Sequence, residues 1–84
     1  MSDIQAELAV RKRISQLEQD MRRADQRATD ACTEVRRAIT AGENVAALDL
    51  DAVDAALVDL RVAKSQYQAA AKEAAELRRA LGGL

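Results

Sequence analysis

Residues 10–38, VRKRISQLEQDMRRADQRATDACTEVRRA, carry an apolar residue at alternating steps of four and three positions. Residues 53–81, VDAALVDLRVAKSQYQAAAKEAAELRRAL, repeat the same spacing. Steps of three and four keep apolar side chains on one face of an α-helix and form the seam of a coiled coil. The sequence therefore predicts two long helices, each with one apolar stripe.

The two stripes match layer by layer when the second is read in reverse. Most layers then set a large side chain against a small one, which lets two antiparallel helices pack closely. The sequence predicts an all-α fold, an antiparallel two-helix hairpin that resembles a coiled coil. The nine predicted layers are Val10/Leu81, Ile14/Leu77, Leu17/Ala74, Met21/Ala70, Ala24/Tyr67, Ala28/Ala63, Ala31/Leu60, Val35/Ala56 and Ala38/Val53.

Helix-breaking residues are confined to two places in the chain. Proline is absent, and glycine occurs only at positions 42, 82 and 83. Gly42 suits the left-handed position that follows a helix. We expect a single domain over residues 1–84, with a first helix at about 3–41, a connection at about 42–49 and a second helix at about 50–81.

The start of the second helix has two candidate N-cap residues, Asn44 and Asp49. Both residue types accept hydrogen bonds from the free amides of a first helical turn. Leu48 and Val53 would then flank an Asp49 cap at the positions of a hydrophobic staple. This pattern favours Asp49.

A lone hairpin covers each seam residue from one side only, so it buries little apolar surface for its size. On one flank of the seam, near the connection, the pattern sets Ile39 beside Leu50 and Cys32 beside Leu57. We expect a homodimer of hairpins that forms a four-helix bundle. Alternatively, a different protein covers this surface. The predicted partner or dimer interface comprises Cys32, Ile39, Leu50, Leu57, Val58 and Val62.

Away from the connection, the flanks of the seam are charged. Several facing positions carry like charges, which do not stabilise an isolated hairpin. This supports the expectation of a partner. The predicted flank contacts are Asp25 with Lys64 and Arg11 with Arg78 on one side, and Asp20 with Glu73 and Glu34 with Asp59 on the other.

Basic residues cluster where the two chain ends meet. Such a patch suits phosphate or an acidic protein surface, although nearby glutamates could make it a solvated face of mixed ion pairs. The predicted basic patch comprises Arg11, Lys12, Arg13, Arg78 and Arg79.

Residues for catalysis or metal binding are scarce. Histidine is absent, and Cys32 is the single cysteine, so imidazole chemistry and a zinc site are excluded. Cys32 is expected to act as a small hydrophobe. Tyr67, the one aromatic residue, is expected to pack in the seam opposite Ala24 with its hydroxyl at the rim. We expect no enzymatic activity, no cofactor and no metal.

The same composition bears on location. One cysteine permits no intrachain disulfide, which fits a reducing compartment. No apolar run is long enough to cross a bilayer, and the first residues are charged where a signal peptide would be apolar. We expect a cytoplasmic protein that binds no membrane, in the host cytoplasm if a virus encodes it.

Architecture and charge give three hypotheses for function. The first is a non-enzymatic protein–protein interaction module, a small adaptor or inhibitor, in the manner of regulators encoded by phages and mobile elements, that binds a larger protein. The layout also resembles the Rop-type plasmid copy-number regulators, dimeric helical hairpins that contact RNA through a helical face. That architectural resemblance implies nucleic-acid binding, but the net charge of −1 favours it less. The third is a self-assembling structural or scaffolding subunit.

Overall fold

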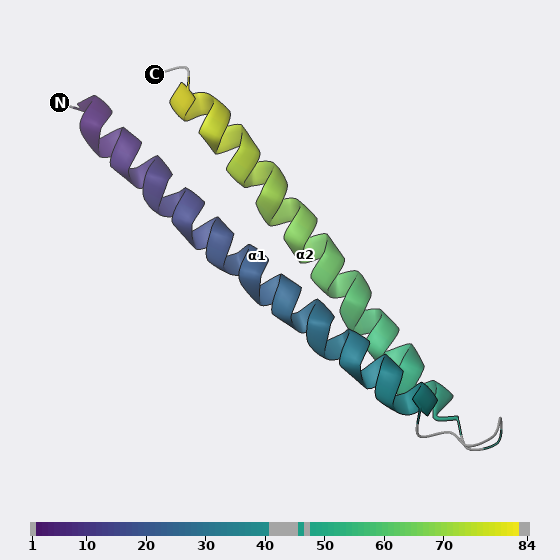
Figure 1. The fold of residues 1–84 in the computed structure, drawn as a ribbon. Helices are drawn as coiled ribbons and strands as arrows, with labels where there is room; N and C mark the ends of the chain where they lie inside the picture. The colour runs from purple at the N-terminus through teal and green to yellow at the C-terminus, as the bar shows by residue number, and fades with distance from the viewer. Residues whose placement is uncertain (1, 41–45, 47, 83–84) are drawn as a thin grey trace.

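The computed structural model describes residues 2–40, 46 and 48–82, and its helices form one long hairpin (Figure 1). Helix α1 runs over Ser2–Thr40, and helix α2 runs over Leu50–Gly82. They lie side by side in opposite directions, so that α1 begins and α2 ends at the same end of the molecule (Figure 1). The resulting rod measures 67 × 15 × 14 Å. The predicted all-α hairpin is therefore confirmed.

The helix ends lie close to those expected. Helix α2 includes Gly82, one residue beyond the predicted end near 81. Glycine is poor in helix interiors but is tolerated in a last turn. The expected roles of Gly42 and Asn44 fall outside the described residues, which omit 41–45 and 47.

Asp49 caps the N-terminus of α2. Its carboxylate Oδ1 accepts a hydrogen bond of 3.0 Å from the backbone amide of Ala52. Its carbonyl oxygen accepts a bond of 3.2 Å from the amide of Val53, the first turn of helical bonding. The free amide of Ala52, which has no helical partner, is thereby satisfied by the cap. The preference for Asp49 drawn from the staple pattern is confirmed.

The core is the predicted seam. Every buried residue that the structure describes belongs to it, and most are alanines, which let the two helices approach closely. Leu17 contacts Ala70 and Ala74, and Met21 and Leu77 pack against this cluster. The buried residues are Ile14, Leu17, Ala24 and Ala31 of α1 and Ala56, Ala63, Ala70 and Ala74 of α2.

Cross-helix polar contacts agree with the register of the two stripes. Arg13 donates a hydrogen bond of 3.0 Å to Glu73, and Arg78 donates one of 2.6 Å to Glu18. These two pairs stand on either side of Leu17 and its partner on α2. The predicted layer of Leu17 with Ala74 therefore agrees with both the core contacts and the flanking bonds.

Tyr67 departs from the prediction. It was expected in the core opposite Ala24, but 42% of its surface is exposed, whereas Ala24 is buried. Alanines at Ala63 and Ala70, one turn away on either side, are buried and hold the helices close together. The phenol ring does not fit into so narrow a gap, and it lies at the edge of the seam instead.

Within the part of the chain that the structure describes, neither helix has a segment that is both long and apolar enough to span a bilayer.

Replacing Ala74 by leucine should destabilise the hairpin by about 1–3 kcal/mol, because Ala74 is 0% exposed and the added carbons overpack the seam. Ala75→Leu is the matched control, since Ala75 is exposed and the change there should stay within about 0.5 kcal/mol. Urea unfolding at one fixed protein concentration measures the free energy of unfolding of both variants. Equal stability of the two variants would contradict the packing described for the seam.

Asp49→Ala should lower the free energy of unfolding by about 1 kcal/mol, because the amide of Ala52 loses its acceptor. Asp49→Ser should retain most of the stability, since serine also caps. Thermal unfolding followed by circular dichroism measures the difference. If serine were as harmful as alanine, the effect would come from the lost charge rather than from the cap.

Candidate protein-interaction surfaces

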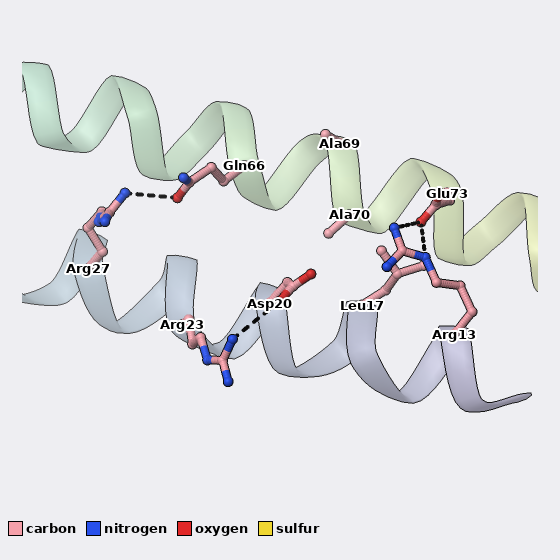
Figure 2. A pocket seen from close by; sticks show the side chains of 9 residues that line it. All are labelled: Arg13, Leu17, Asp20, Arg23, Arg27, Gln66, Ala69, Ala70 and Glu73. Atoms are coloured by element: carbon pink, nitrogen blue, oxygen red, sulfur yellow. Dashed lines mark hydrogen bonds and ion pairs between the residues drawn. The ribbon is translucent and has the colours of Figure 1, made fainter.

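One side of the seam, which we term the polar flank, is lined by residues seven apart on each helix. Their side chains border two grooves between the helices, the first of which is drawn in Figure 2. The polar flank comprises Arg13, Asp20, Arg27 and Glu34 of α1 and Ala52, Asp59, Gln66 and Glu73 of α2.

Bonds within the protomer neutralise much of the polar flank. Arg13 forms an ion pair of 2.8 Å with Glu73, and Arg27 donates a hydrogen bond of 3.0 Å to Gln66 (Figure 2). Asp20 pairs with Arg23 at 3.6 Å on its own helix. Asp20 and Glu73 both line the first groove, so the prediction placed them correctly, and the arginine beside each carboxylate reduces the expected repulsion.

The second groove holds the other expected like-charged pair. Glu34 and Asp59 both line it, so the prediction placed them correctly. Arg37 lies one helical turn from Glu34 and pairs with it at 3.0 Å. The repulsion that was expected there is thus reduced within the hairpin itself.

The other side of the seam, which we term the apolar flank, has a different chemistry. Near the connection, its large side chains are exposed: Ile39 by 55%, Leu50 by 64% and Leu57 by 42%. Cys32 is a half-buried free thiol. Each of these four residues was predicted as interface on the spacing of the stripes. The apolar flank comprises Asp25, Cys32 and Ile39 of α1 and Leu50, Leu57 and Lys64 of α2.

Tyr67 adds an aromatic ring to this side of the molecule. It lines a small groove with Met21 and Asp25, together with two charged residues of α1. Asp25 belongs to the apolar flank, so the exposed part of the ring extends that surface toward the middle of the hairpin. The seam spacing alone did not place Tyr67 here.

Charged residues on this side of the molecule divide into two groups. Near the open end, Arg78 pairs with Glu18 at 2.6 Å, and Arg11 pairs with Glu7 at 2.9 Å. Arg11 and Arg78 line one groove as expected, but each has a glutamate beside it. Asp25 and Lys64, by contrast, form no ion pair with any residue that the structure describes.

A third surface lies on the side of α2 turned away from α1. Val58 and Val62 are exposed, Val58 by 57%, and one helical turn separates them. Ala55, Ser65 and Ala69 continue the same stripe in both directions and are exposed as well, and Ala55 and Ala69 also border the two grooves of the polar flank. We term this stripe the outer face.

Most basic side chains of the predicted patch bond to acceptors within the hairpin. Arg11, Arg13 and Arg78 each form an ion pair with a glutamate, and Arg79 donates to the carbonyl oxygen of Ala75. Lys12 is exposed on α1. The arrangement resembles the mixed ion-pair surface that was the alternative reading of these residues.

Sequence reasoning missed one exposed apolar pair. Ile4 and Leu8 are exposed by 66% and 60% near the open end of α1. They lie one turn apart but outside the nine-layer stripe, and their spacing of four was the signal that would have found them.

Among the residues described, no group of three or more cysteine, aspartate or glutamate side chains is placed to hold a metal ion. No protein-family model matches the sequence, and neither a curated protein nor a solved structure is significantly similar to it. Any function must therefore be argued from the surfaces of this hairpin.

Proposed function

We propose that this protein is a non-enzymatic protein–protein interaction module, a small helical adaptor or inhibitor that binds a larger protein. The observation that carries the proposal is the exposure of large apolar side chains on two separate faces of one hairpin. Exposed apolar area that is contiguous and bordered by polar residues is typical of protein-binding surfaces. The proposed site of action is the cytoplasm.

The surface area supports this view. A compact monomer of 9.1 kDa exposes about 4,900 Å². The hairpin exposes 6541 Å², roughly a third more. A helical rod with one seam cannot bury its flanks by itself, so association with other helices would stabilise it. We therefore propose that two hairpins form a homodimeric four-helix bundle.

One contact cannot cover both apolar faces. Leu57 and Val58 are consecutive in α2, so their side chains point about 100° apart around the helix. A protein docked flat on the apolar flank would leave Val58 and Val62 in water. We assign the apolar flank to self-association and the outer face, centred on Val58 and Val62, to the larger partner.

The outer face suits a helix of another protein. Its residues follow steps of three and four, the spacing that a second helix can pack against. Small side chains at Ala55 and Ala69 would allow a close approach on either side of the two valines. We propose that binding a helix of the larger protein is how this hairpin acts as an adaptor or inhibitor.

Replacing Val58 and Val62 together by glutamate should abolish capture of the larger partner from an extract of the source cells. Both valines are exposed, so the variant should keep its helical circular dichroism. Gln68→Glu, an exposed site on the same helix, adds charge without touching the outer face and should capture the partner normally. Equal capture by all three proteins would overturn the assignment of the outer face.

A gel shift tests the nucleic-acid alternative. Because glutamates pair with three arginines of the basic patch, we expect no retarded RNA or DNA band at about 50 mM salt with protein up to about 100 µM. A band that fades as salt rises, and that is lost in Arg11→Gln/Arg78→Gln, would favour nucleic-acid binding. Sedimentation into large, open-ended assemblies would favour a scaffolding subunit.

A further inference from the structure

The two flanks of the seam differ in how their polar groups are satisfied. On the polar flank, Arg13 and Arg27 bridge the helices to Glu73 and Gln66. On the apolar flank, no such bridge crosses the described part of the seam between Asp25 and the connection. Three large apolar side chains and two unpaired charges occupy it instead. A partner is therefore expected on the apolar flank and not on the polar flank.

We propose that a second copy of this chain covers the apolar flank, with the two connections at the same end of the bundle. The proposal rests on the bundle put forward above and names its interface and orientation. The two-fold axis runs parallel to the helices, so α1 of each copy lies on α2 of the other. The contact is isologous, as expected for a two-fold dimer.

The register of the hairpin determines which residues of the two copies come into contact across this axis. Residues at the same level on α1 and α2 become neighbours between copies. Ile39 then lies on Leu50 of the second copy, and Cys32 lies on Leu57 of the second copy. Because of the two-fold symmetry, each of these two apolar contacts near the connection occurs twice in one dimer.

Charge complementarity favours the same arrangement. At the next level along the flank, Asp25 of each copy faces Lys64 of the other. Neither residue forms an ion pair within the described protomer, so both are available for this contact. Beyond them, Tyr67 faces the groove that Met21 lines on the second copy. The flank is therefore self-complementary in apolar, charged and aromatic contacts.

The opposite orientation brings one apolar pair together, Ile39 on Ile4 of the second copy, but it mismatches the charges of the flank. With the connections at opposite ends and full overlap, α1 lies on α1, and residues whose numbers add to about 43 become neighbours. Asp25 then faces Glu18 of the second copy, which places like charges together. Cys32 faces Arg11 of the second copy, which sets an apolar group against a charge. Both contacts are unfavourable.

The interface is large enough for a reversible dimer. From Glu18, in the groove that Tyr67 lines, to Ile39, the apolar flank and this groove together are about 30 Å long, and two helices are about 20 Å wide. This gives about 600 Å² per copy, or about 1,200 Å² in total, at the lower end of specific interfaces. Association should accordingly be measured by sedimentation equilibrium from about 1 µM to about 1 mM.

Two charge reversals test the orientation. Asp25→Lys alone sets lysine against Lys64, and Lys64→Asp alone sets aspartate against Asp25, so each homodimer should be about tenfold weaker than the wild-type dimer. Mixed in equal amounts, the two variants restore both pairs. The mixture should form a heterodimer of near wild-type affinity, which native mass spectrometry identifies by mass.

Controls use equal charge changes away from the flank. Asp30→Lys and Lys72→Asp are exposed and lie outside the proposed contact, so they should dimerise as the wild type does. Tighter self-association of Asp25→Lys would overturn the proposal, because that variant gains a contact with Glu18 in the opposite orientation. Failure of the mixture to form a heterodimer would overturn it as well.

Leu57→Asp separates this inference from the proposed function. It should weaken the dimer by about 100-fold or more, since two copies of Leu57 lose their contact, while the helical content at low concentration stays unchanged. Undiminished dimerisation of this variant would overturn the apolar flank as the interface. Capture of the larger partner through Val58 and Val62 would still stand in that case, because it depends on the outer face.

Discussion

The contact of Leu17 with Ala70 and Ala74 determines how closely the two helices approach, and the rest of the molecule depends on that distance. Most residues of the core are alanines, so the helices pack with little between them. Each alanine buries few carbons and contributes about 1 kcal/mol or less. Many small contributions along the seam therefore make up the free energy of unfolding. A single larger side chain in the seam lowers it, because the closely packed helices have no room for it.

Close approach has a second effect, which is to leave larger side chains at the edges. Tyr67 lies at one edge because its ring is too large for the gap that Ala63 and Ala70 allow. Leu57 and Ile39 lie beside the seam and not in it. They are exposed to water because α1 and α2 do not cover them. The slim core and the exposed ring of Tyr67 thus have the same origin in the alanine content.

The sequence predicted the parts of this structure that periodicity controls. Steps of three and four gave both helices, the reversed pairing of Leu17 with Ala74, and the exposed residues beside the connection. The Asp49 cap followed from local hydrogen-bonding chemistry. Periodicity carries no information on how far a side chain extends, so it placed Tyr67 wrongly. It also placed charges by position alone, and long arginine side chains such as Arg13 reach a carboxylate that the helical wheel sets at a distance.

The single aromatic residue provides an intrinsic probe. With no tryptophan or phenylalanine in the chain, the near-ultraviolet emission of this protein comes from Tyr67 alone. Its ring stands half exposed beside Met21 and Asp25, at the surface that we propose as the dimer interface. Quenching of that emission by a small neutral solute therefore reports whether this groove is open or covered, without attaching a dye or altering any residue.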